Sequence, residues 1–175
     1  MGLQIGDSLP SFSLQGVDGK KWSSSDFSSV ICVIFTCNHC PYAIAYEKRL
    51  VDIQNKFQDK VQLCAINSND EVHYPDDSFE NMVVRSKERS FNFPYLRDES
   101  QEVAKHFGAL CTPHIFLFDM EKKLKYMGRI DDNWKDESGV TDKSLSNAID
   151  SVLKESPINN AFTHPLGCSI RSEEH

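Results

Sequence analysis

The sequence predicts one α/β domain in which a central mixed β-sheet is flanked by helices. Residues 30–35 (VICVIF) are apolar on both faces and rich in β-branched side chains, which is typical of a strand covered on both sides. Apolar residues then recur at helical spacing from Pro41 to Phe57, and residues 61–66 have the composition of a second strand. This order of strand, helix and strand implies a parallel pair joined by a right-handed crossover.

The other elements follow from turn and capping signals. The Asp18-Gly19 pair between apolar residues predicts a small N-terminal β-hairpin. After a polar stretch, Asp77 and Glu80 form a predicted capping box for a helix that carries apolar residues as far as Phe91. The later elements expected are a shorter helix from an Asp98 cap to a Gly108 stop, a strand at 114–118, its hairpin partner over Leu124–Ile130, and a last helix with Leu145, Ile149 and Val152.

Composition and charge narrow the function. The chain has 175 residues, 39% hydrophobic and 26% charged, as in an ordinary globular domain. The chain has 26 acidic and 19 basic residues, and the resulting net charge of −7 opposes binding to nucleic acids and anionic membranes. The longest apolar run, residues 30–35, is far shorter than the roughly 18 to 20 residues that span a bilayer. We expect a single domain over 1–175, with 156–175 as an appended tail, and neither a nucleic-acid nor a membrane partner.

The cysteines point to redox chemistry. The N-terminus lacks the basic and apolar regions of a secretory leader, which predicts a cytoplasmic location. Most of the six thiols should be free in that reducing compartment, so a close pair is informative. Cys32 and Cys64 lie in apolar strands and are expected to be inert small hydrophobic residues.

Such a pair is present in Cys37-Asn38-His39-Cys40, between the 30–35 strand and the helix that follows it. Two thiols at this spacing can close a short disulfide. The helix N-terminus carries about half a positive charge, and His39 adds a full charge when protonated, unless it is only an exposed loop residue. Such surroundings lower a thiol pKa from about 8.5 into the range of about 3.5 to 7.5. The pattern therefore predicts a favoured thiolate, and a protonated His39 would raise the reduction potential.

Cys111-Thr112-Pro113 comes directly before the 114–118 strand. An X-Pro bond can be cis, and a turn of this kind could present the Thr112 backbone to the extended chain of a substrate. Cys111 lies close to the dithiol in such an arrangement or is a packed bystander. In the tail, Cys168 is either a third redox thiol that folds back over the site or a docked structural residue.

Together, a dithiol at a helix start and a Thr-Pro pair some seventy residues later resemble the thioredoxin fold. IGDSLPSFSL from Ile5 and the turn after it resemble the N-terminal extension of the AhpC/TSA, or redoxin, branch, and the segments FTCNHCPYA, AINSND, DDNWKD and THPLGCSI resemble a bacterial subgroup of that family. The resemblance implies that Cys37 attacks, that Cys40 is the buried resolving thiol and that Pro113 is the cis proline. Thiol exchange through these two cysteines requires no bound organic cofactor.

The chain also departs from the family pattern. The 30–35 strand contains no acid of the kind that serves thioredoxins as a proton acceptor, so proton transfer is unassigned. Aligned on Cys40, the proline and threonine of the peroxiredoxin pattern are replaced by Val33 and Cys37. Arg129 stands in for the peroxide-polarising arginine or is a solvated edge residue.

Three functions remain open at this stage. The first is a thiol-disulfide oxidoreductase, whose Cys37 thiolate attacks a protein disulfide, whose Cys40 resolves the mixed disulfide, and which an upstream thiol reductase restores. The alternative is a thiol peroxidase in which Cys40 is oxidised by a peroxide and Cys37 or Cys168 resolves the sulfenic acid. The third is a metal-binding or redox-sensing module, although a zinc site would need a distant ligand such as Cys111 or Cys168.

Overall fold

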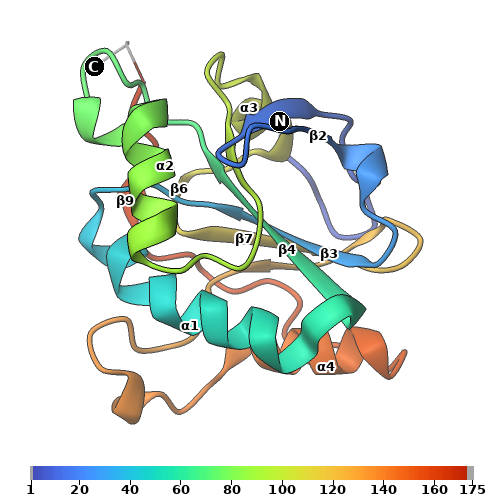
Figure 1. The fold of residues 1–175 in the computed structure, drawn as a ribbon. Helices are drawn as coiled ribbons and strands as arrows, with labels where there is room; N and C mark the ends of the chain where they lie inside the picture. The colour runs from blue at the N-terminus through green and yellow to red at the C-terminus, as the bar shows by residue number, and fades with distance from the viewer. Residues whose placement is uncertain (1, 173–175) are drawn as a thin grey trace.

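The computed structural model describes residues 2–172; the last three residues of the predicted tail, 173–175, lie outside the described residues. Seven strands form one mixed sheet in the order β2-β1-β5-β4-β3-β7-β8 (Figure 1). The predicted parallel pair is β3 with β4, and β3 also pairs antiparallel with β7. The strands are β1 (Ser13–Gly16), β2 (Lys21–Ser23), β3 (Val30–Phe35), β4 (Val61–Asn67), β5 (Tyr95–Arg97), β7 (His114–Phe118) and β8 (Leu124–Gly128).

Helices cover both faces of this sheet, which explains why β3 is apolar on both sides. Val30, Cys32 and Ile34 pack on the side of α1 (Pro41–Phe57), α2 (Phe79–Glu88) and α4 (Ser144–Leu153). The alternate residues of β3 pack on the other side, against α3 (Glu102–Phe107) and the N-terminal hairpin. Successive side chains of a strand point to opposite faces, so only a two-sided core buries all six residues. Short 3₁₀ turns lie at Ser24–Asp26, Gln58–Lys60, Pro75–Asp77 and Glu137–Gly139.

The helix predicted from Asp77 to Phe91 begins and ends at other residues in the structure, where it is α2 (Phe79–Glu88). Its N-cap is Ser78, whose hydroxyl accepts a hydrogen bond from the Asn81 backbone N–H at 3.2 Å, while the Asp77 side chain turns away into the protein. The helix ends at Glu88, and Ser90 has a left-handed φ of 54° that turns the chain. Phe91 therefore packs from the following loop, where its ring contacts Phe93.

Strand β5 was not predicted; it is only three residues long and lies between β4 and β1. The following helix starts at Glu102 rather than directly after Asp98. Asp98 still caps it, because its carboxylate accepts the backbone N–H groups of Val103 and Ala104 at 3.3 and 2.9 Å. Gly108 ends α3 in the left-handed conformation, as predicted.

The tail returns to the body of the protein. Its short strand β9 (Cys168–Ser169) pairs antiparallel with β6 (Cys111–Thr112), so residues more than fifty positions apart lie side by side (Figure 1). Pro113 joins β6 to β7, and the Thr112–Pro113 peptide bond is cis. The β9 part of the tail therefore lies beside the segment that precedes β7, an interior strand of the sheet.

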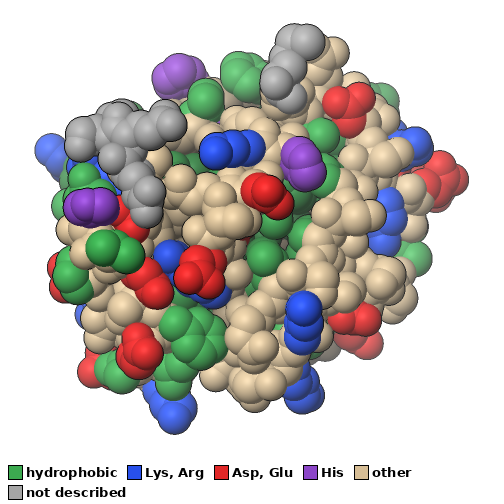
Figure 2. Space-filling model, turned by 90° about the horizontal axis from the view of Figure 1, so that it is seen from above, with side chains coloured by type: hydrophobic (Ala, Val, Ile, Leu, Met, Phe, Trp, Pro, Cys, Tyr) green, Lys and Arg blue, Asp and Glu red, His purple; other side chains and the backbone are tan. Residues whose placement is uncertain are grey.

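Within residues 2–172, none of the helices is both long and apolar enough to cross a membrane. Figure 2 shows one face of the molecule, on which acidic and basic side chains are interspersed. This face lacks the continuous stripe of Lys and Arg that nucleic-acid binding surfaces use.

Candidate active site

The dithiol lies at the carboxyl end of β3, where the chain turns into α1. Cys40 is the N-cap residue of that helix and Pro41 is its first residue. The cis-proline loop faces the two cysteines. The Cys37 Sγ is 3.3 Å from the Thr112 hydroxyl, and the Cys40 Sγ is 3.4 Å from the Thr112 carbonyl oxygen, which accepts a hydrogen bond from Cys40 when that thiol is protonated. Cys37 is only 3% exposed and Cys40 is fully buried. One threonine thus contacts both sulfurs.

The turn between the two cysteines is fixed by hydrogen bonds of Asn38. Its backbone N–H donates to the Asp77 carboxylate at 2.7 Å, and its side-chain amide donates to the Asp76 carbonyl at 2.9 Å. The Tyr95 hydroxyl donates to the Asn38 amide oxygen at 2.8 Å. These bonds hold Asn38, and with it the turn between the two cysteines, against β5 and the Pro75–Asp77 turn.

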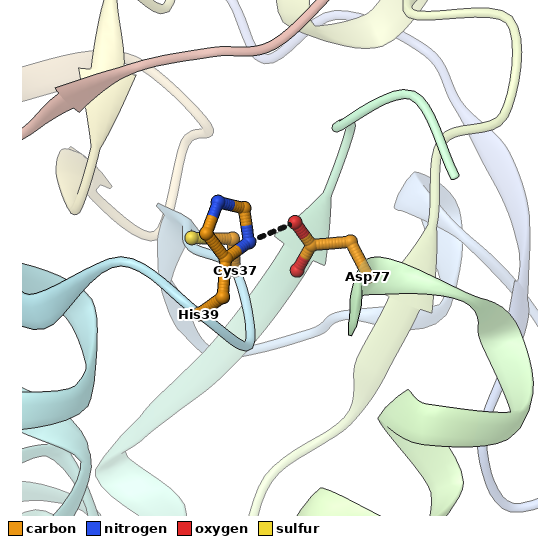
Figure 3. Close-up of side chains that lie close together, drawn as sticks. All are labelled: Cys37, His39 and Asp77. Atoms are coloured by element: carbon orange, nitrogen blue, oxygen red, sulfur yellow. Dashed lines mark ion pairs between the residues drawn. The ribbon is translucent and has the colours of Figure 1, made fainter. Parts of the chain in front are cut away.

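Asp77 is a fully buried carboxylate beside the dithiol. Besides the Asn38 backbone, it accepts hydrogen bonds from the side-chain amides of Asn67 at 3.2 Å and Asn69 at 2.9 Å. His39 Nδ1 lies 2.5 Å from Oδ2 of Asp77, the oxygen that also accepts the Asn69 amide, and forms an ion pair with it when the imidazole is protonated (Figure 3). The His39 ring also stacks on Tyr74. A carboxylate absent from the central strand is therefore supplied by a loop some forty residues later.

These surroundings act differently on the two thiols. The pKa of Cys40 is lowered to about 4, because its sulfur accepts hydrogen bonds from the thiols of Cys37 and Cys168 and from the Ala43 backbone, which together outweigh burial. The pKa of Cys37 is raised by its hydrogen bond to Cys40, by burial and by the charge of Asp77. The pair therefore loses one proton readily and holds the other. These directions favour a negative charge on Cys40 over one on Cys37; among the causes that raise the pKa of Cys37, the charge of Asp77 comes after the hydrogen bond to Cys40 and burial.

Of the other predicted residues, Cys168 lies against the dithiol and Cys111 is buried in the neighbouring strand. Arg129 is held by Asp142 at 2.7 Å and by the Ser144 hydroxyl at 3.0 Å, so its guanidinium is occupied by partners on the α4 side. Arg129 is therefore a partly exposed ion-pair residue at the sheet edge, closer to the predicted solvated edge residue than to a peroxide-polarising arginine.

A metal ion would find one group of potential ligands among the described residues. The ligand atoms of Cys37, His39 and Asp77 lie within 4.8 Å of one another. The oxygens of Asp77 already accept three hydrogen bonds from asparagines 38, 67 and 69. A metal would have to replace some of these bonds, which makes Asp77 better suited to orienting His39 and Asn38.

The sequence did not predict the roles of four residues at the site: Asp77, Asn67, Asn69 and Tyr95. For the two asparagines, one sequence feature could have indicated a place near the dithiol. Residues 67–70 (NSND) come directly at the carboxyl end of β4, and the carboxyl ends of parallel strands meet at the same edge of a sheet. Since the dithiol follows β3, these polar side chains had to lie near it. The position of Asp77 had no such signal, because a capping residue is the common interpretation of its sequence context.

His114, directly after the cis proline, links pH to stability. Its ring is buried, and Nδ1 accepts the Leu110 N–H at 3.2 Å. Burial, followed by the charge of His164, lowers the pKa of His114 from 6.5 to about 4. The unfolded chain therefore binds a proton before the folded one does, and stability that is complete above pH 6.5 is lost as the pH falls toward 4.

We expect the free energy of unfolding to fall by about 3 kcal/mol over this window through His114 alone. Urea denaturation at stepwise pH should show a shallower fall for His114→Gln, which keeps an acceptor but does not titrate. The exposed His106→Gln is the matched control and should follow the wild type. Identical slopes for His114→Gln and the wild type would contradict this assignment.

The mixed sheet, the two-cysteine turn at a helix start and the cis-proline loop facing it together define a thioredoxin-like redox fold. The sequence pattern of the AhpC/TSA family matches residues 5–127, and the chain belongs to this family. It is an oxidoreductase, as its family and fold indicate.

Solved structures agree with this assignment. A conserved protein from Geobacillus kaustophilus, described as uncharacterized, is 37% identical with a TM-score of 0.92, over 98% of this chain and 94% of that one. A hypothetical protein from Sinorhizobium meliloti is 31% identical with a TM-score of 0.93, over 100% and 98% of the two chains. The peroxidoxin BcpB from Mycobacterium tuberculosis, 17% identical with a TM-score of 0.65 over 87% and 97% of the chains, shares the fold. No curated protein matches the chain.

Proposed function

We propose that the protein is a thiol-disulfide oxidoreductase in which Cys37 and Cys40 cycle between dithiol and disulfide. The observation that carries this proposal is the joint contact of both sulfurs with Thr112 at 3.3 and 3.4 Å. The Thr112 hydroxyl can donate to a Cys37 thiolate while its carbonyl accepts the Cys40 thiol proton. This loop therefore stabilises the state in which the charge has moved from Cys40 to Cys37.

The reaction then follows in two exchanges. As a substrate disulfide approaches, a proton passes from Cys37 to Cys40, and the Cys37 thiolate attacks one substrate sulfur. The first substrate thiolate leaves and a mixed disulfide remains. Cys40 next attacks the Cys37 sulfur as its proton passes to the departing second substrate sulfur, which leaves as a thiol, and the Cys37–Cys40 bond closes. Asp77 and His39 act as positioning residues for the turn. An upstream dithiol reductase returns the two electrons.

A thiol peroxidase is the second candidate, and the lowered pKa of Cys40 favours it. The Cys40 thiolate would attack a peroxide oxygen, and the second oxygen would leave as hydroxide, which takes a proton from solvent to become water. Cys37 would then condense with the resulting sulfenic acid to form the disulfide and a second water. Both sulfurs are buried, which hinders a protein substrate more than a peroxide.

Stopped-flow mixing of the reduced protein separates the two candidates. The oxidoreductase account expects oxidation by a protein disulfide to be about a hundredfold or more faster, per mole of oxidant, than oxidation by hydrogen peroxide. It also expects Cys37→Ser to abolish the reaction. Fast peroxide consumption that survives Cys37→Ser and disappears in Cys40→Ser would establish the peroxidase instead. Stoichiometric zinc or copper in protein purified without chelator would favour a metal-binding module over both.

A further inference from the structure

Residues 163–171, here called the strap, cross the site and are held at both ends. At the first end, the Thr163 hydroxyl lies 2.6 Å from the Tyr126 hydroxyl and accepts the Arg129 backbone N–H at 2.9 Å. A Cβ on Gly128 would lie 2.1 Å from that Thr163 hydroxyl, so only glycine permits the close approach. The strap therefore begins at a fixed point on β8.

The other end is held above the polar edge of β4. The Arg171 backbone N–H donates to the Asn69 side chain at 2.8 Å, and the Arg171 carbonyl accepts from the Asp70 backbone at 2.9 Å and the Gln101 side chain at 2.6 Å. The Arg171 guanidinium lies over the Tyr74 ring. These contacts fix the strap next to Asn69, which also binds Asp77.

Between these ends, the strap pairs with the residue that touches both thiols. Cys168 is directly opposite Thr112 in the β6–β9 pair. A Cβ on Gly167 would lie 2.0 Å from the Thr112 carbonyl oxygen, so the backbones are in close contact there. Cys168 packs against the cluster formed by Cys37, Cys40 and Ala43. Directly opposed residues of an antiparallel pair have their Cα atoms only about 4.5 to 5.5 Å apart.

The three sulfurs differ in their access to solvent. Cys37 and Cys40 are buried, whereas Cys168 is partly exposed. A dithiol reductase approaching from solvent therefore meets Cys168 before it meets either sulfur of the pair. The strap also occupies the edge of Thr112 at which an extended substrate chain would pair.

We propose that Cys168 is a third redox-active thiol, through which the buried Cys37–Cys40 disulfide is passed to the surface. This inference rests on the proposed function. The Cys168 thiolate attacks the Cys40 sulfur of the disulfide, a Cys40–Cys168 disulfide forms, and the Cys37 thiolate leaves and takes up the proton that Cys168 gave up. A dithiol reductase then attacks Cys168, Cys40 leaves as a thiolate, and the second thiol of the reductase releases Cys168.

The electrostatics of the site agree with this order. In the reduced protein the pKa of Cys168 is raised to about 11 by burial, by its hydrogen bond to Cys40 and by the charge on Cys40, while Arg171 lowers it. Oxidation of Cys40 removes the second and third of these causes, so Cys168 becomes more acidic when it is needed. In the second step Cys40 is a good leaving group, because thiols of low pKa leave faster.

Disulfide mapping of full-length variants tests the proposal. After mild oxidation with diamide and acid quench, Cys37→Ser should contain an intramolecular Cys40–Cys168 bond, found by non-reducing peptide mass spectrometry. The bond should persist when Cys111→Ser is added, because Cys111 is the neighbouring thiol on β6, and it should be absent when Cys168→Ser is added. Gly167→Ala, which keeps all thiols but displaces the strap, should lower the yield about tenfold.

A kinetic arm uses dithiothreitol as the reductant. The oxidised Cys168→Ser protein should be reduced about tenfold more slowly than the oxidised wild type, and Cys111→Ser within about twofold of it. Equal rates for wild type and Cys168→Ser, or no Cys40–Cys168 bond in Cys37→Ser while Cys168→Ser still forms Cys37–Cys40, would overturn the inference alone. Absence of a Cys37–Cys40 bond in both wild type and Cys168→Ser would overturn the proposed function and the inference together.

Discussion

Cys37→Ser is expected to lower the turnover of protein-disulfide reduction by at least about a thousandfold, because it removes the nucleophile of the first exchange. Cys40→Ser should fail differently. Its first exchange proceeds, but nothing resolves the product, so a mixed disulfide between Cys37 and the substrate accumulates. Insulin reduction followed by turbidity measures turnover, and intact mass spectrometry under non-reducing conditions detects the trapped species.

Cys111→Ser serves as the matched control for both variants. Cys111 is a buried thiol on the strand that carries Thr112, so its replacement tests whether loss of any nearby sulfur disables the site. Its turnover should stay within about twofold of the wild type. Insulin reduction at the wild-type rate by Cys37→Ser would exclude Cys37 as the attacking thiol.

Asp77→Asn is expected to have the second largest effect, on both stability and acidity. The carboxylate accepts hydrogen bonds from three asparagines and faces His39, whereas an amide presents one NH₂ group to these donors. The new NH₂ group would face N–H donors that Asp77 now accepts, and these buried donors would be left without an acceptor. We expect this to lower the free energy of unfolding by about 2 to 4 kcal/mol. Of the causes that raise the pKa of Cys37, which are its bond to Cys40, burial and the Asp77 charge, the substitution removes the third, so this pKa should fall.

Two measurements check this prediction. Urea denaturation gives the change in stability, and thiolate ultraviolet absorbance against pH gives the titration of the pair. Asp76→Asn is the control, because Asp76 is adjacent and exposed and only its backbone carbonyl binds Asn38. Unchanged titration in Asp77→Asn would show that this carboxylate does not act on the dithiol.

Much of the fold could be predicted from local patterns. The two-sided β3 and the stripe of α1 are long periodic signals, and they fixed the parallel β3–β4 pair. The three-residue β5 carries too few residues for a period, so only its partners on both sides make it a strand. The end of α2 was misplaced because Phe91 continues the apolar spacing after the chain has turned at Ser90.

The site could be predicted only where its chemistry is local. The spacing of Cys37 and Cys40 and the Thr112-Pro113 pair are visible in the sequence. The charge on the pair is not, because it depends on Asp77 and on a sulfur of the tail, both brought in by tertiary contacts. For the same reason the sequence left open whether Cys168 reaches the dithiol, and the β6–β9 pairing places it there.

A redox titration of Cys168→Ser protein tests the central claim most directly, since the strap thiol is then absent. Equilibration in glutathione buffers of graded potential, acid quench and peptide mapping should give one two-electron transition between about −270 and −120 mV, the span of dithiol oxidoreductases. The bond formed across it should be Cys37–Cys40. If both cysteines stay open to alkylation throughout this range, they do not form a redox pair, and the account is contradicted.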